Sequence, residues 1–177
     1  MNAKATREER LGRLRERADT WVGAAQNPSA ESAAVIEVAF LMAAADGVIS
    51  DAEFDQLTAT IEHVTARNIS PAGVRLIIKH MTDTLTLDGW EGRLVAAAQN
   101  VWNPLARRNA YRFAAGVSFI DGSVQEEEAR LFALLAEAFE IPLDEASALL
   151  MEVRDYLYGG SELTNPVILL TPDMKRM

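Results

Sequence analysis

Apolar residues recur along most of this chain at the three- and four-residue spacing of amphipathic helices. Leu11, Leu14, Ala18 and Trp21 form the first such stripe, and similar stripes follow as far as Leu157. Polar capping residues, prolines and glycines interrupt the pattern between stripes, as is typical of helix ends. The pattern predicts eight helices, over residues 6–26, 29–45, 50–64, 70–85, 87–101, 103–120, 124–139 and 142–159.

Two of these helices are apolar around most of their circumference. Residues 35–42 of the second helix and residues 113–120 of the sixth contain few polar side chains. A helix that is apolar on every side is usually buried. The sequence therefore predicts an all-α bundle with these two helices at its centre. Trp21, Trp90 and Trp102 are expected to be packing residues, although Trp90 stands among charged neighbours and could instead lie at a surface contact.

Each apolar helix ends at an Asp-Gly pair, and a glutamate follows seven positions after the aspartate. Asp46 and Asp121 lie 75 positions apart, and so do Glu53 and Glu128. Glycine is typical just past a helix end, and glutamate is a good cap in a first turn. Capping explains either residue alone. It does not require both residues at one fixed offset in both halves of the chain.

The doubled motif therefore predicts an internal repeat. Two three-helix units are expected, over about residues 30–85 and 104–158, within a single domain that covers residues 1–160. Residues 161–177 form a C-terminal tail outside the repeat. The expected fold is a compact all-α bundle of about eight helices.

The composition and the net charge exclude several classes of function. The chain has 177 residues, of which 49% are hydrophobic and only 6 are proline, so it is long and apolar enough to bury a core. The absence of cysteine excludes thiolate catalysis and cysteine-bound metals. A net charge of −9 argues against nucleic acid as a partner. The arginines between positions 7 and 17 alternate with acidic residues, which we interpret as a solvated helix face.

The expected location is the cytoplasm. The N-terminus is polar and resembles no secretory signal. The longest apolar run, residues 38–45, is far shorter than the roughly 18 residues that a membrane span needs. No transmembrane segment is therefore expected.

The sequence contains no catalytic signature, so we expect a protein that is not an enzyme. His63 and His80 stand outside the spacings of known zinc and di-iron motifs and are predicted to be surface histidines. The Asp-Gly segments also differ from the EF-hand calcium loop, in which glycine is the sixth residue and glutamate the twelfth. Carboxylates remain as the candidate chemistry, and calcium or magnesium prefers such oxygen ligands.

Two segments resemble the tellurite-resistance TerB family. They read AFLMAAADGVISDAE at residues 39–53 and GVSFIDGSVQEEE at residues 116–128, and family members similarly place Asp-Gly after an apolar helix, twice. The resemblance spans about residues 29–158. It implies a compact helical bundle of the kind also found in DnaJ-like proteins, with roles in tellurite resistance, stress responses and metal sensing. It also implies protein partners at the inner membrane surface, and acidic motif residues at Asp46, Glu53, Asp121 and Glu128.

Two hypotheses about function follow. In the first, the protein is a non-enzymatic, stress-associated module that binds a divalent cation, calcium or magnesium, through these four carboxylates. In the second, it is a protein–protein interaction scaffold without metal, and the acidic residues only cap helices. The second hypothesis draws on the apolar residues 167–170, between Pro166 and Pro172, which either dock on their own domain or bind a partner.

Overall fold

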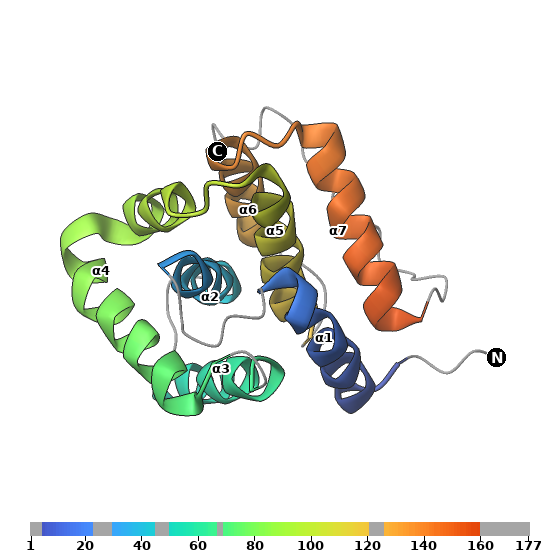
Figure 1. Ribbon diagram of the computed structural model, residues 1–177, viewed down its shortest axis with the longest axis horizontal. Helices are drawn as coiled ribbons and strands as arrows, with labels where there is room; N and C mark the ends of the chain where they lie inside the picture. Colours follow the sequence, from blue (N-terminus) through green and yellow to red (C-terminus); the bar gives the residue numbers. More distant parts are fainter. Residues whose placement is uncertain (1–4, 23–29, 45–49, 67–68, 121–125, 160–177) are drawn as a thin grey trace.

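A computed structural model of the chain describes residues 5–22, 30–44, 50–66, 69–120 and 126–159. Every regular element in these ranges is a helix, which confirms the predicted all-α class (Figure 1). The helices are α1 (Arg7–Trp21), α2 (Ala30–Ala43), α3 (Asp51–Val64), α4 (Pro71–Gln99), α5 (Pro104–Phe119), α6 (Glu126–Ala138) and α7 (Leu143–Tyr158). None of these described helices is both long and apolar enough to cross a membrane.

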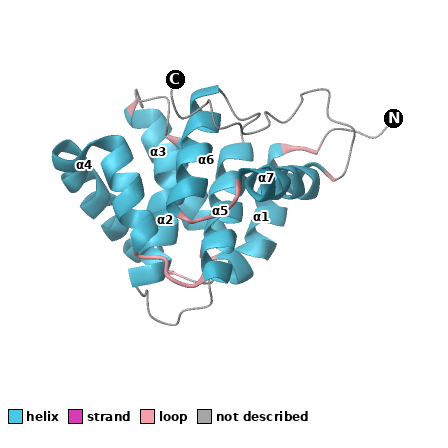
Figure 2. Ribbon diagram, turned by 90° about the horizontal axis from the view of Figure 1, so that it is seen from above, coloured by secondary structure: helices cyan, strands magenta, loops and turns pink. Residues whose placement is uncertain are grey.

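The two apolar helices lie at the centre, as predicted. All residues of α2 from Ala34 to Met42 are buried, and α5 is buried from Phe113 to Val117. α2 packs against α3, α4, α5 and α6, and α5 also packs against α1 and α7. Figure 1 shows α2 nearly end-on, with α4 curving around one side of it and α5 on the other. Figure 2 shows the same bundle turned by 90°.

The predicted helix starts are confirmed at four capping residues. Ser50 Oγ accepts a hydrogen bond from the backbone N–H of Glu53, and Ser70 Oγ accepts one from Gly73 N at 3.1 Å. Asn103 Oδ1 accepts from the N–H groups that open α5, and Thr6 caps α1 with Glu9 in the same way as Ser50 caps α3. Each cap satisfies an N–H group that has no partner within its own helix.

The described residues form seven helices, not the eight predicted. The sequence predicts separate helices at residues 70–85 and 87–101, but α4 continues through this point and changes direction only at Gly89. Gly89 has φ 71° and ψ 170°, a conformation that glycine adopts without the strain that a Cβ atom would cause. Between residues 85 and 87 neither proline nor glycine stops the helix, so the break occurs later than predicted.

One tryptophan also differs from its prediction. The sequence predicted Trp102 to be a packing residue, but it is 71% exposed, whereas Trp21 is buried.

Two of the arginines of α1, Arg10 and Arg13, contact other helices, which corrects the interpretation of a solvated face at these positions. Arg10 Nε donates to the carbonyl of Ile120 at 2.9 Å, and Arg13 Nη1 donates to the carbonyl of Leu157 at 2.6 Å. The Arg10 guanidinium also lies over the ring of Tyr158. The last carbonyls of a helix lack partners within it and attract cations. These arginines therefore hold α1 against the C-terminal ends of α5 and α7.

Candidate functional site

The structure describes two of the four predicted carboxylates. Asp46 and Asp121 lie outside the described residues, whereas Glu53 and Glu128 lie within α3 and α6. Among the described side chains, no three from histidine, aspartate and glutamate gather in a way that could hold a metal ion. The geometry of the acidic motif can therefore be followed at its two glutamates and at the helix ends beside them.

Glu53 is part of the cap of α3. Its Oε2 accepts hydrogen bonds from the backbone N–H of Ser50 at 2.8 Å and from the Ser50 hydroxyl at 2.7 Å. The backbone bond first, and then the hydroxyl bond, hold the pKa of Glu53 below its ordinary value. Glu53 is exposed and is ionised at neutral pH. Both of these bonds end on Oε2, and a carboxylate can accept about four hydrogen bonds in all, so the cap does not exhaust its capacity.

Glu53 and Glu128 each lie near the start of a helix that follows one of the two buried helices, α2 or α5. The environments differ, because Glu128 is half-buried and Glu53 is exposed. Their matching positions are read from the sequence, seven residues after Asp46 and Asp121.

The C-terminal end of α2 and the N-terminal end of α6 contact the same short stretch of α4. Trp90 Nε1 donates to the carbonyl of Leu41, in the last turn of α2, at 3.1 Å. The next residue, Glu91, forms an ion pair with Arg130 of α6 at 2.7 Å. Arg130 follows Glu128 by two residues. The C-terminal end of α2 and the first turns of α6 therefore border one region of the bundle.

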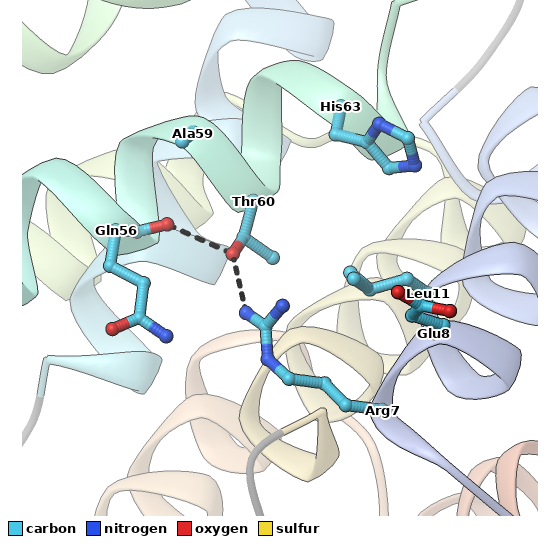
Figure 3. Close-up of a pocket in the computed structure, with 7 residues that line it drawn as sticks. All are labelled: Arg7, Glu8, Leu11, Gln56, Ala59, Thr60 and His63. Carbon is cyan, nitrogen blue, oxygen red and sulfur yellow. Dashed lines mark hydrogen bonds between the residues drawn. The ribbon is translucent and has the colours of Figure 1, made fainter.

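A cleft between α1 and α3 was not predicted from the sequence. It has a volume of about 480 Å³ and is lined by Arg7, Glu8 and Leu11 from α1 and by Gln56, Ala59, Thr60 and His63 from α3 (Figure 3). Arg7 Nη2 donates to Thr60 Oγ1 at 3.2 Å, and the Thr60 hydroxyl donates to the carbonyl of Gln56 at 2.9 Å. These two bonds fix the Arg7 guanidinium across the cleft.

The side chains that line this cleft are suited to non-covalent binding through hydrogen bonds, ion pairs and apolar contact. The cleft combines a guanidinium, an imidazole and a carboxylate around the side chain of Leu11. His63 is exposed, as predicted for both histidines. The α3 wall could have been found from the sequence, because positions 56, 59, 60 and 63 share one face of a helix. The α1 wall could not, since the contact between α1 and α3 spans 53 positions.

Comparisons of the chain with protein families, with curated proteins and with solved structures find no match. The described residues thus define an all-α bundle with two buried central helices, each followed by a helix with a glutamate near its start. The resemblance to the TerB family rests on the two motif segments alone.

Proposed function

We propose that this protein is a non-enzymatic, TerB-like module of stress or tellurite resistance that binds a divalent cation. The ligands are Asp46, Glu53, Asp121 and Glu128, and the cation is calcium or magnesium. The observation that carries the proposal is that each of the two glutamates lies near the start of a helix that follows a buried helix, at the same offset from an Asp-Gly pair. Oxygen-rich sites of this kind suit hard cations.

The proposal includes the internal repeat, with units at residues 30–85 and 104–158. In both halves the buried helix packs against a later helix, α2 against α4 and α5 against α7. The third helix also contacts the second in each unit, as α4 contacts α3 and α7 contacts α6. Similar packing in the two halves supports a common origin for the two motifs. With α4 counted as two segments separated by Gly89, the described residues contain eight helical segments.

The helices outside the units give a second argument for the repeat. On α5, Arg10 of α1 donates to the carbonyl of Ile120, just past the end of that helix. On α2, Trp90, directly after the Gly89 kink, donates to the carbonyl of Leu41 near the end of that helix. Each buried helix thus has a side chain from an additional helix bonded to its C-terminal carbonyls.

The same additional helices also contact the helices that carry the motif glutamates. Arg7 of α1 bonds to Thr60 of α3, and Glu91 of α4 pairs with Arg130 of α6. The surroundings of the two motifs are therefore similar in kind. For the four carboxylates to act as one site, the two motifs must in addition lie side by side, and the titrations below test this.

A cation would relieve the repulsion between these carboxylates. Two unit charges 4 Å apart repel by about 1 kcal/mol in water and by several times more near a protein surface. An ion that binds only the folded state stabilises it by about 2.7 kcal/mol at a concentration of 100 Kd. In this proposal the protein works in the cytoplasm, and the cation-bound form engages a protein partner at the inner membrane surface, as the resemblance implies.

Calorimetric titration with calcium and with magnesium tests the proposal. The full chain should bind one of these ions with a rise in melting temperature, and Asp46→Asn with Asp121→Asn should abolish both effects. Asp144→Asn is the matched control, because Asp144 lies in the first turn of α7 outside the motifs. Binding that is absent from the unmodified chain, or unchanged in the Asp46→Asn/Asp121→Asn variant, would refute cation binding.

The capping geometry of Glu53 favours the alternative, an interaction scaffold without metal. Glutamine can replace glutamate in a capping box but carries no charge. If Glu53 is only a cap, Glu53→Gln should leave calcium and magnesium titrations unchanged and should alter melting no more than Glu9→Gln. Glu9 makes the same box with Thr6, with a backbone bond of 2.7 Å, and lies outside the motifs. If Glu53 is a ligand, Glu53→Gln should weaken cation binding and Glu9→Gln should not.

A further inference from the structure

The cleft between α1 and α3 has the size of a small-molecule site. Its volume of about 480 Å³ lies within the roughly 300–1,000 Å³ that is usual for such sites. Residues from the first two turns of α1 and from α3 line it, and neither Glu53 nor Glu128 is among them. The proposed cation site therefore leaves this cleft without a role.

Arg7 is held in place at one side of the cleft. Thr60 is only 6% exposed, and its hydroxyl donates to the carbonyl of Gln56 at 2.9 Å while it accepts from Arg7 Nη2 at 3.2 Å (Figure 3). Because the hydroxyl hydrogen is directed to this carbonyl, the oxygen presents a lone pair to the guanidinium. A side chain that is already ordered loses less conformational freedom when a ligand binds. The planar guanidinium also matches a carboxylate, with which it forms two parallel hydrogen bonds.

Glu8 supplies the opposite charge at the same cleft. Figure 3 shows no hydrogen bond between Glu8 and Arg7, and among the described residues Glu8 has no hydrogen bond or ion pair. The reason is helical geometry, because consecutive residues lie about 100° apart around the axis and do not face each other. A cationic and an anionic group therefore line one cleft without pairing with each other. Such an arrangement suits a ligand that carries both charges.

Leu11 places an apolar surface beside the two charges. It follows Arg7 by four positions and Glu8 by three, so these residues are neighbours on the surface of α1. Ala59 adds apolar surface from α3, and the exposed His63 adds an imidazole that can donate a hydrogen bond to an anion. The cleft thus presents a cation, an anion and an apolar surface close together. These features match the carboxylate, the ammonium group and the side chain that an amino acid carries on its α-carbon.

We propose that this cleft binds a free α-amino acid with an apolar side chain. Arg7 binds the carboxylate, Glu8 binds the ammonium group, and Leu11 contacts the side chain. A simple anion is less suited, because Glu8 and the net charge of −9 repel it. A simple cation is less suited, because the charge of Arg7 repels it. A zwitterion has no net charge and pairs with both groups. This site is independent of the proposed cation site.

Three matched probes test the proposal by NMR titration of the full chain. Leucine carries both charges, isocaproate is the same molecule without the ammonium group, and isoamylamine is the same molecule without the carboxylate. Leucine should shift the amide signals of residues 7–11 and 56–63 in a saturable way and leave those of α6 unchanged. The other two should bind at least about tenfold more weakly, because each leaves a charged hydrogen bond unmade. No saturable shift with leucine, or equal affinity for leucine and isocaproate, would overturn the proposal.

Two variants and a control assign the charges to their residues. Glu8→Gln should weaken leucine binding about tenfold and remove the preference for leucine over isocaproate. Asp55→Asn is the matched control and should bind leucine unchanged, because Asp55 is an exposed acid of α3 that does not line the cleft. Arg7→Gln should abolish leucine binding. It also removes the bond to Thr60, so its folding is checked by circular dichroism, and Glu8→Gln decides the outcome if Arg7→Gln is unfolded. Leucine binding that is unchanged in Glu8→Gln, or equally weak in Asp55→Asn, would show that the assignment is wrong.

Discussion

A buried ion pair joins α2 to the part of α4 that follows Gly89. Arg93 Nε donates to Glu37 Oε1 at 2.7 Å, and Arg93 Nη2 donates to the same oxygen. The side chains of Glu37 and Arg93 are only 10% and 13% exposed. Asp88, at 3.4 Å from Arg93 Nη1, is 46% exposed and supplies a second, weaker partner. Glu37 is the one charged residue in the buried stretch of α2 from Ala34 to Met42.

Replacing one partner should cost far more than replacing both. Arg93→Leu leaves the Glu37 carboxylate buried beside an apolar side chain, and breaking a buried pair in this way costs about 3–5 kcal/mol. Glu37→Leu should cost less, about 1–3 kcal/mol, because Arg93 keeps Asp88 and its long side chain can carry the guanidinium toward water. The double variant contains no buried charge, and its stability should lie close to that of the original chain.

Urea denaturation followed by circular dichroism measures these differences at 25 °C. For a chain of this size 1 kcal/mol corresponds to about 2–4 °C in melting temperature, so Arg93→Leu should melt roughly 10 °C lower. The order expected, from most to least stable, is the original chain and the double variant together, then Glu37→Leu, then Arg93→Leu. The reasoning fails if Arg93→Leu costs under about 1 kcal/mol, or if the double variant is as unstable as Arg93→Leu.

Three further predictions concern a helix contact, two capping glutamates and a helix end. Gly116→Ala should destabilise the protein by about 1–3 kcal/mol in urea denaturation, because a Cβ there would lie 2.5 Å from Cδ1 of the buried Leu14, and the same substitution should cost less in a Leu14→Ala background. Hydrogen bonds at the helix starts lower the pKa values of Glu9 and Glu53 in the folded protein. The stability that these two ionised carboxylates contribute to the folded state is therefore complete above the ordinary glutamate pKa. It is lost as the pH falls through the lowered pKa values of the folded state. The variant with Glu9→Gln and Glu53→Gln should therefore lose less stability than the original chain when melting is followed from pH 6 toward about pH 2. Gly159→Ala should cost about 1 kcal/mol in the same urea assay, because φ is 75° at this position, and an unchanged midpoint would contradict the left-handed cap.

The helix starts were predictable because their signals are local. Ser50, Ser70 and Asn103 each accept a hydrogen bond from a residue two or three positions away, so the sequence contains both partners within one turn. The buried faces of α2 and α5 were predictable for a similar reason, since a helix that is apolar all round has no face for water. The break in α4 was not, because Gly89 lies among residues that are compatible with helix on both sides. One glycine in a helix costs only about 1 kcal/mol, which tertiary contacts can outweigh or exploit.

Side chains that hold separate helices together were harder to predict than the helices themselves. The bond from Arg13 to Leu157 spans 144 positions, and the bond from Trp90 to Leu41 spans 49. Nothing near Arg13 in sequence distinguishes it from an arginine on a solvated face, because its partner is a backbone carbonyl that every residue carries.

The function of the acidic motif was hard to predict for a different reason: a glutamate near a helix start can have two chemical roles. A glutamate near the start of a helix can serve both as a partner in a capping box and as an oxygen ligand of a hard cation. Sequence spacing therefore cannot separate the two roles, and the bonds from Ser50 to Glu53 establish the first without excluding the second. Charge separates them, because a cap needs only an acceptor oxygen, whereas a cation needs the negative charge. Glutamine retains the oxygen and removes the charge, so the response of Glu53→Gln to calcium and magnesium, measured beside Glu9→Gln, decides which role this residue has.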